Sequence, residues 1–338
     1  MRPEDLVPLP RELAHLRRFA LDGALYLFDR DTGLSALCDG PEVEHLRMRA
    51  PRVVQFAITN ACNMACGFCS RDASDESRWT EESAFELLAA LDRAGTLEVA
   101  FGGGEPLVFR AFVPLVERLH RETRLAVSFT TNGTRLTHEA LSRLAKHTAQ
   151  VRLSIYEDND HPRASALLRE HRVRWGANYL VTPARLPTLE ATVFALVERG
   201  CHNVLLLAYN GDDASMHLSR RESDAMQTRV AALATALRGR ASIELDVCWG
   251  DRMQRVPQLI RSEGCPAGTE FVVVTSDRRL AACSFHHASF AFEDAEDLLH
   301  KWRAHRSALL APARAPGCAR DLAALDRHAE RGRSLPVL

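Results

Sequence analysis

The sequence predicts an α/β fold, in which a partial (β/α)6 barrel is followed by a small α+β extension. Between residues 52 and 240, apolar runs of strand length alternate with amphipathic segments of helix length, and six such pairs follow one another. After Gly239 the alternation stops, and short strand-like runs separated by turn residues replace it. Six β/α units favour a parallel sheet with crossover helices, but they are too few for a closed eight-fold TIM barrel.

The first unit shows how each barrel element is justified. "RVVQFAIT" (52–59) is mostly apolar and has the length of a buried strand. "TEESAFELLAALDRAG" (80–95) has Thr80 as a helix cap, apolar residues at helical spacing and Gly95 at its end. The same reasoning predicts further strands at 97–102, 124–131, 150–156, 173–181 and 203–209, and further helices at 109–122, 137–147, 161–171, 187–199 and 218–238.

Shorter elements are expected on both sides of the barrel. "ALYLFDRDTGLSALC" (24–38) is typical of a hairpin that turns at Asp31–Gly33. After the barrel we expect a strand at 242–248, a hairpin at 270–283 that turns near Ser276–Arg278, and a helix at 294–308. The chain is therefore divided into an N-terminal hairpin-containing segment, the barrel and a C-terminal domain, at 1–50, 51–240 and 241–338.

The composition of the 338-residue chain excludes several classes of protein. Hydrophobic residues make up 46% and charged residues 26%, and the net charge is −1 at pH 7, so nothing favours nucleic acid or an anionic membrane as a partner. The N-terminus lacks the apolar core of a signal peptide, and no apolar run is long enough to span a bilayer, so a cytoplasmic location is expected. Nine cysteines, an odd number, then favour metal or thiol chemistry over disulfides.

Three cysteines lie within eight positions of one another in "ACNMACGFCS", at Cys62, Cys66 and Cys69. They follow the first barrel strand directly, at the end of the sheet where barrel folds assemble their sites. A closed structural zinc site would need a fourth ligand from elsewhere. A [4Fe–4S] cluster held by three thiolates instead leaves one iron free for an external ligand. Both interpretations make these cysteines metal ligands.

A glycine-rich motif, "FGGGEP" (101–106), ends the second strand. Glycines allow close approach of the backbone, and Glu105 offers a carboxylate to an ammonium group. Together with the Cys-x3-Cys-x2-Cys spacing one unit earlier, this motif strongly resembles those of the radical S-adenosylmethionine (SAM) superfamily, over roughly residues 52–320.

The resemblance implies which residues bind the cofactors. Cys62, Cys66 and Cys69 would hold a [4Fe–4S] cluster with an open iron, and the glycine-rich motif would bind the amino group of SAM. "SIYEDND" (154–160) departs from the Ser-x-Asp-Gly that the family commonly has there. Taken alone, each polar or aromatic residue expected at SAM could equally be an ordinary structural residue. The residues expected at SAM are Phe68, against the adenine, with Gly103, Gly104, Glu105, Pro106, Asn132, Ser154 and Asn178.

The resemblance also implies the reaction. One electron from the cluster, supplied by a donor such as flavodoxin or ferredoxin, would cleave SAM to a 5′-deoxyadenosyl radical that abstracts hydrogen from a substrate C–H. The protein's task would be to position the substrate and to exclude water and oxygen, so no catalytic acid or base is assigned.

A second set of cysteines, Cys265, Cys283 and Cys318, lies after the barrel. The order cysteine, hairpin, cysteine, helix, cysteine resembles the short SPASM or twitch extension of this superfamily, which binds an auxiliary iron–sulfur cluster. Three possibilities stay open for this site: one of four further residues supplies the fourth ligand, the fourth position is open to substrate or solvent, or the domain is vestigial and binds nothing. These candidates are Cys248, His286, His287 and Asp321, whereas Cys38 and Cys201 are interpreted as ordinary thiols.

Members with such extensions most often modify peptides, so the first hypothesis is a maturase of a ribosomally made precursor peptide. The segment before residue 52 resembles the leader segments of such enzymes but is short for a complete peptide-recognition domain, so a separate partner could recognise the leader. The alternatives are a dehydrogenase or rearranging enzyme for a small molecule such as an aminocyclitol or sugar, and a non-catalytic iron–sulfur or zinc protein.

Overall fold

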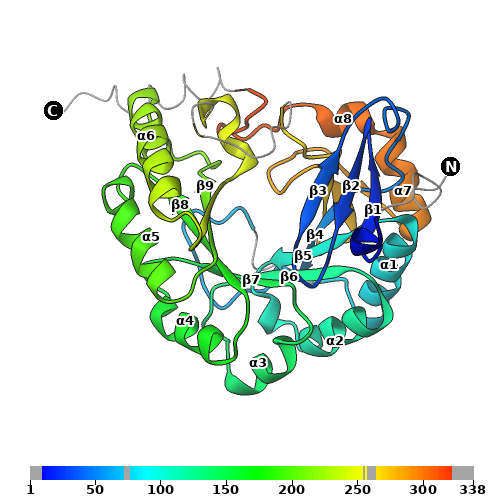
Figure 1. Ribbon diagram of the computed structural model, residues 1–338, viewed down its shortest axis with the longest axis horizontal. Helices are drawn as coiled ribbons and strands as arrows, with labels where there is room; N and C mark the ends of the chain where they lie inside the picture. Colours follow the sequence, from blue (N-terminus) through cyan, green and yellow to red (C-terminus); the bar gives the residue numbers. More distant parts are fainter. Residues whose placement is uncertain (1–9, 72–76, 254–255, 257–263, 322–338) are drawn as a thin grey trace.

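The computed structural model describes residues 10–71, 77–253, 256 and 264–321. Its centre is a curved, open barrel of parallel strands with helices on the outside (Figure 1). The strands run in chain order around the curve, as predicted for consecutive β/α units. They are β4 (Val53–Thr59), β5 (Glu98–Gly103), β6 (Ala126–Thr131), β7 (Gln150–Ser154), β8 (Trp175–Val181), β9 (Asn203–Ala208) and β10 (Ser242–Leu245).

The helices confirm the six expected positions to within a few residues. The first begins after Thr80, whose side chain accepts a hydrogen bond from the Ser83 backbone, and it ends at Gly95, whose φ of 121° suits only glycine well. The outer helices are α1 (Glu81–Ala94), α2 (Phe112–Glu122), α3 (His138–Leu144), α4 (His161–Glu170), α5 (Leu189–Glu198) and α6 (Arg220–Ala236). None of the described helices is long and apolar enough to cross a membrane.

The sheet crosses the boundary that was placed at residue 240. β10 pairs in parallel with β9, and β11 (Phe271–Val274) pairs in parallel with β4 at the other edge. The expected C-terminal hairpin is confirmed as β11 and β12 (Arg279–Ala281), and β13 (Ser289–Ala291) extends it. The C-terminal strands therefore continue the barrel sheet at both edges, and the division into three domains stays a prediction.

The predicted C-terminal helix is two helices. α7 (Ala295–Ala304) and α8 (Arg306–Leu310) are separated at His305, whose φ of −104° and ψ of 22° interrupt the helical geometry. The second barrel helix, predicted at 109–122, also starts later than expected. A 3-10 turn at Pro106–Val108 comes first, and α2 begins at Phe112.

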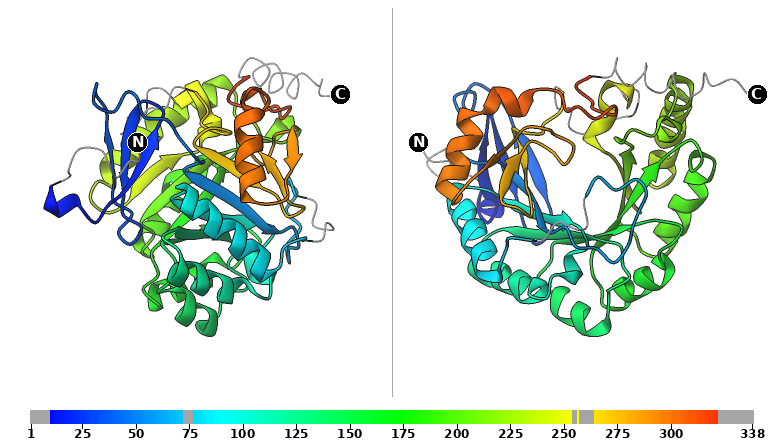
Figure 2. Two further views of the ribbon diagram at one scale, coloured as in Figure 1. Left: turned by 90° about the vertical axis from the view of Figure 1, so that its right-hand side faces the viewer. Right: turned by 180° about the vertical axis from the view of Figure 1, so that it is seen from behind.

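An N-terminal sheet packs against the starts of two barrel strands. The predicted hairpin is present as β2 (Ala24–Phe28) and β3 (Ser35–Cys38), and β1 (Arg17–Leu21) adds a third antiparallel strand. The buried residues Phe19 and Phe28 pack against Leu97 and Ala126, at the starts of β5 and β6. In Figure 2 (left), this blue sheet and the orange hairpin of β12 and β13 lie on opposite sides of the barrel.

Buried aromatic rings join the sheet to its outer helices. Phe112 of α2 contacts Phe101 and Phe129 edge-on, with ring centroids 5.4 Å and 5.2 Å apart. Burial of these rings therefore fixes α2 against β5 and β6.

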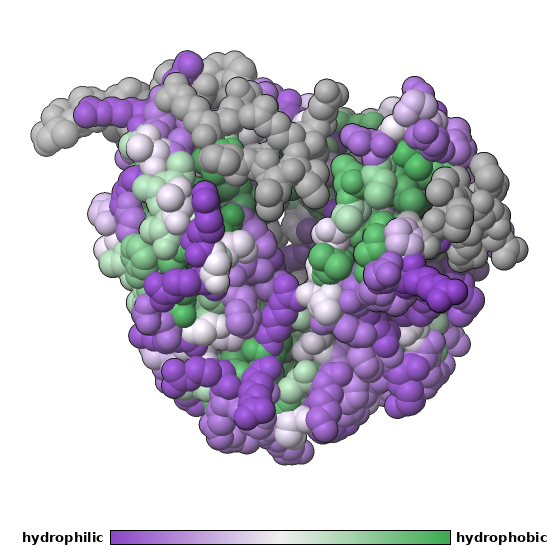
Figure 3. All heavy atoms as spheres, in the orientation of Figure 1, coloured by the Kyte–Doolittle hydropathy of each residue, from purple (hydrophilic) through white to green (hydrophobic). Residues whose placement is uncertain are grey.

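The outer surface of the helices is mostly hydrophilic in Figure 3, where a recess near the centre of the view marks the open side of the barrel.

Phe112→Ala should lower the free energy of unfolding by about 3–5 kcal/mol, because it removes a buried ring and leaves a cavity. The matched control is Phe194→Ala on α5, where the ring is 38% exposed and the cost should stay within about 0.5 kcal/mol. Urea unfolding of both variants measures the difference. Equal losses for the two variants would contradict this view of the core.

Candidate active site

A cavity of about 740 Å³ lies at the carboxyl ends of the barrel strands. Side chains from β4 to β9 and from the loops after them line it, as expected for a barrel site. Ten of its lining residues were predicted to bind a cluster or SAM, and they are Cys62, Cys66, Phe68, Cys69, Gly103, Gly104, Glu105, Asn132, Ser154 and Asn178. Pro106 is the exception: it lies buried at the start of the 3-10 turn that follows Glu105.

The glycine-rich motif holds the beginning of the cysteine loop by direct backbone contact. The Gly104 N–H donates to Thr59 O over 2.6 Å, and the Glu105 N–H donates to Ala61 O over 3.0 Å. A Cβ atom on Gly103 would lie 2.3 Å from Thr59 O, and one on Gly104 would lie 2.1 Å from Ala61 O. These two glycines are therefore required for the approach of protein backbone, whereas the sequence analysis assigned them to a ligand.

Gly102 borders the open cavity and was missed. A Cβ atom there would have no heavy atom within 4 Å. Its place in "FGGGEP" was a sequence signal, but three consecutive glycines do not reveal which of them faces protein and which faces open space. The structure separates the two roles.

The Glu105 carboxylate ties the end of β5 to the end of β6. It is 1% exposed and accepts hydrogen bonds from the Thr131 hydroxyl, the Asn132 N–H and the Leu107 N–H. Burial raises the pKa of Glu105, and these three donors oppose that shift. A carboxylate offers about four lone-pair positions, so these three donors do not use all of its acceptor capacity.

Asn132 connects the third strand to the cysteine loop itself. Its amide Nδ2 donates to Asn63 Oδ1 over 3.1 Å and approaches Cys62 Sγ at 3.9 Å. Asn63 in turn donates to the Thr134 hydroxyl over 2.7 Å. Asn132 was expected beside a nucleoside; in the structure it lines the cavity and also holds the loop that carries Cys62.

Aromatic and polar side chains form the opposite wall of the cavity. The rings of Phe68 and Tyr156 lie 5.0 Å apart between centroids. Ser154 and Asn178 are neighbours across β7 and β8, and Asn178 Oδ1 has no hydrogen-bond partner among the described residues. A buried acceptor without a partner at a cavity wall is suited to a ligand donor. Tyr156 was missed, because nothing in "SIYEDND" distinguishes a ring that lines the cavity from one in the core.

Asn159, within "SIYEDND", has a structural role at the ends of two strands. Its side chain donates to Asn132 O over 2.8 Å and to Ser154 O over 2.7 Å, and its oxygen accepts from the Tyr156 N–H. One buried amide therefore fixes the ends of β6 and β7 and the backbone of Tyr156.

The two cysteine sets are spaced too widely for a single metal ion. Two thiolates on one tetrahedral zinc lie about 3.8 Å apart. Within the described parts of the chain, neither set brings three or more of its sulfur atoms within 4.8 Å of one another. Burial raises the pKa of Cys66, which favours the thiol until a metal binds. The sulfur atoms of neither set are therefore arranged as the ligands of a single zinc ion would be.

A second cavity, of about 110 Å³, brings together four cysteines from distant parts of the chain. Cys265, Cys283 and Cys318 were expected there, and Cys248 is the fourth. Cys248 follows β10, Cys265 precedes β11, Cys283 follows β12 and Cys318 follows α8. The topology therefore supplies four thiols from four separate loops.

Backbone amides and the Arg320 guanidinium influence the thiols of Cys265 and Cys283. Burial raises the pKa of both Cys265 and Cys283, while the N–H groups of Ala267 and Phe285 lower them as hydrogen-bond donors. Amide donors of this kind stabilise thiolate sulfur.

The structure also orders the other candidates for the fourth ligand. His286 lines the second cavity, but its two ring nitrogens contact backbone groups of Ala288 and Ala311 at 3.1 Å. Asp321 and His287 are not among the described residues that line it. Cys201 lies apart in the core, where burial raises its pKa to about 12, as expected for an ordinary thiol. Cys248 is thus the candidate that the geometry favours.

The two cavities adjoin. The Arg71 guanidinium, beside Cys69 in sequence, donates to the Ser284 hydroxyl over 3.1 Å, next to Cys283. Residues from the barrel and from the C-terminal segment line both cavities, and they are Gln55, Asn210, Asp246, Ser284 and Phe285. The two cysteine sites therefore face a common region at the barrel mouth.

Comparison with known proteins identifies the barrel. Residues 56–205 match the family model of the radical SAM superfamily. The chain is 31% identical over 119 residues to the 7-carboxy-7-deazaguanine synthase of Rhodopirellula baltica, covering 35% of this chain and 46% of that protein. It is 35% identical over 98 residues to the mycofactocin maturase MftC of Mycobacterium tuberculosis, covering 28% and 25%. The matched region thus spans less than half of either relative.

Solved structures agree on the fold. SuiB of Streptococcus suis superimposes with a TM-score of 0.69 at 13% identity, covering 86% of this chain and 87% of that one. SuiB bound to its precursor peptide SuiA gives a TM-score of 0.64 at 16% identity, covering 75% and 65%. The family match over residues 56–205 and the shared fold agree: this part of the chain is similar to the radical SAM superfamily, whose members use a [4Fe–4S] cluster and SAM.

Proposed function

We propose that this protein is a radical SAM enzyme that modifies a peptide, with an auxiliary iron–sulfur cluster beside the first. The observation that carries the proposal is the pair of adjoining cavities, one lined by three cysteines and the other by four. Three thiolates leave one iron of a [4Fe–4S] cluster open, whereas four complete a closed cluster. The chain thus offers one site whose cluster would keep an iron free for SAM and a second site whose cluster would have no free iron.

The described residues fit SAM in the first cavity. Gly102 leaves open space, Glu105 keeps acceptor capacity for an ammonium group, and Asn178 Oδ1 offers an acceptor for a hydroxyl. Phe68 and Tyr156 present apolar rings that suit an adenine base. When bound, the cluster and SAM supply the one-electron cleavage that makes hydrogen abstraction from a C–H possible. The chain's own part is to hold the ligands and to shield the site from water.

A peptide substrate is favoured by the comparisons and by the position of the second site. SuiB is known bound to a precursor peptide, and MftC is named a maturase. The auxiliary site would lie beside a substrate in the shared region. The N-terminal sheet packs at the opposite ends of β5 and β6, so we propose that a separate partner recognises any leader and that a ferredoxin or flavodoxin supplies electrons.

A small-molecule substrate is the second candidate. The synthase of R. baltica is named for a small-molecule product, and most of the residues that line the first cavity belong to β4–β9 and to the loops after them. A non-catalytic metal-binding role is the third hypothesis, and it predicts no SAM cleavage. Anaerobic reconstitution with SAM, a reductant and candidate peptides or sugars, read by mass spectrometry, separates the three.

Wild-type protein should convert SAM to 5′-deoxyadenosine and methionine, and Cys66→Ala should abolish this cleavage because the first cluster loses one of its three anchors. Cys38→Ala is the matched control, since Cys38 lies in the N-terminal sheet away from both cavities. Liquid chromatography of the products measures the effect. Cleavage retained in Cys66→Ala would contradict the proposal.

Cys248→Ala should lower the iron content from about eight to about four atoms per chain, as should Cys283→Ala, because both cysteines would hold the auxiliary cluster. SAM cleavage should stay measurable in both variants while modification of substrate stops. Iron and sulfide analysis of anaerobic samples checks the count. An unchanged iron content in Cys248→Ala alone would remove Cys248 as the fourth ligand.

Gly104→Ala should prevent assembly of the first cluster, because its Cβ would lie 2.1 Å from Ala61 O and displace the cysteine loop. Gly102→Ala is the matched control: it should keep the cluster and weaken SAM binding instead, since its Cβ would enter open space in the cavity. Visible absorption and equilibrium binding of SAM distinguish the two. Equal loss of iron from both variants would contradict these separate roles.

A further inference from the structure

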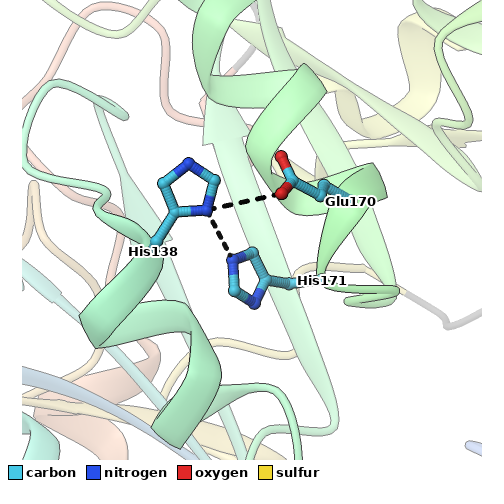
Figure 4. A group of neighbouring side chains, drawn as sticks. All are labelled: His138, Glu170 and His171. Carbon is cyan, nitrogen blue, oxygen red and sulfur yellow. Dashed lines mark hydrogen bonds and ion pairs between the residues drawn. The ribbon is translucent and has the colours of Figure 1, made fainter.

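A group of three potential metal ligands lies on the outside of the barrel, apart from both cysteine cavities. His138 is the first residue of α3, Glu170 is the last residue of α4, and His171 follows it (Figure 4). His138 Nδ1 lies 3.0 Å from His171 Nε2 and 3.6 Å from Glu170 Oε1. The three ligand atoms all lie within 4.8 Å of one another.

The spacing of these atoms suits one metal ion. Two ligands at about 2.1 Å from an ion are about 3.0 Å apart when adjacent in an octahedron and about 3.4 Å apart in a tetrahedron. The two separations measured from His138 Nδ1 lie close to these values. Without a metal, the two rings share a single hydrogen bond, which requires only one of the facing nitrogens to carry a proton.

The backbone that presents two of the ligands is well defined. At the end of α4, the His171 N–H donates to Leu167 O and the Arg172 N–H donates to Arg169 O. Arg172 adopts a φ of 53°, the left-handed conformation that closes a helix. Glu170 and His171 are thereby held side by side at a helix C-terminus, whose exposed carbonyls favour a cation.

The third ligand comes from the neighbouring helix. Thr137 caps α3 by accepting a hydrogen bond from the Ala140 N–H, so His138 stands at a fixed helix start. The positive end of this seven-residue helix opposes a cation, and the full charge of Glu170 outweighs that partial charge. The side chains of His138 and Glu170 are 63% and 64% exposed, which leaves room for water to complete the coordination.

We propose that His138, Glu170 and His171 form a surface site for a divalent cation of the zinc, cobalt or nickel type. Two imidazoles and one carboxylate suit these ions, whereas calcium and magnesium prefer oxygen ligands alone. Because the ligands come from two helices, the bound ion ties the start of α3 to the end of α4. These helices flank β7, which carries Ser154 at its end. The proposal does not depend on the proposed enzymatic function.

Zinc binding tests the proposal on anaerobically reconstituted protein, in which the cysteine sites are filled. Calorimetric titration should show one zinc equivalent that is weakened at least tenfold in His171→Ala and in Glu170→Gln. The matched control is His147→Ala, because His147 pairs with His120 at 5.1 Å between ring centroids but belongs to no three-ligand group in the described parts of the chain. This control should bind zinc as the wild type does.

Thermal unfolding provides a second measurement. Zinc at ten times its dissociation constant for the wild type should raise the Tm of the wild type and of His147→Ala by about 2 °C, and it should raise that of Glu170→Gln by less than about 1 °C. Glu170→Gln keeps the size of the side chain, so it remains informative if His171→Ala does not fold. Equal zinc binding in all variants, or no zinc-dependent shift in wild-type Tm, would overturn the proposal.

Discussion

The candidate active site depends on one close approach of two backbone segments. Gly103 and Gly104 lie against residues 59–61, at a distance that no side chain at either glycine would allow. This contact fixes where the cysteine loop leaves β4. Glu105, the next residue, then joins β5 to β6 through Asn132, which reaches the same loop at Cys62. The cysteine loop, the two glycines and the carboxylate thus form one connected unit at the mouth of the barrel.

The barrel sheet also positions the second set of cysteines relative to the first. β10 and β11 extend opposite edges of the barrel sheet, so the loops beside them bring Cys248 and Cys265 to the barrel mouth from the two edges. The four-cysteine cavity is therefore lined by loops next to strands that continue the barrel sheet. A substrate in the region between the cavities would contact walls from both parts of the chain.

Local patterns were enough to predict the six β/α units from their periodicity, the two hairpins from their turn residues, and the three-cysteine loop from its spacing after the first strand. They did not predict that β11 pairs with β4, because parallel pairing between strands more than 200 residues apart leaves no local pattern. For the same reason the gathering of Cys248 with the other three cysteines could only be left as one of several alternatives. Tyr156 and Asn159 were missed since their roles depend on which way a strand-end loop turns.

The central claim is that the cluster bound by Cys62, Cys66 and Cys69 has an iron that accepts SAM. Electron paramagnetic resonance of the anaerobically reduced protein, recorded with and without SAM, measures this most directly. The account predicts that SAM changes the signal of one cluster and leaves that of the auxiliary cluster unaltered. A spectrum that is identical with and without SAM, from protein that contains its full iron, would contradict it.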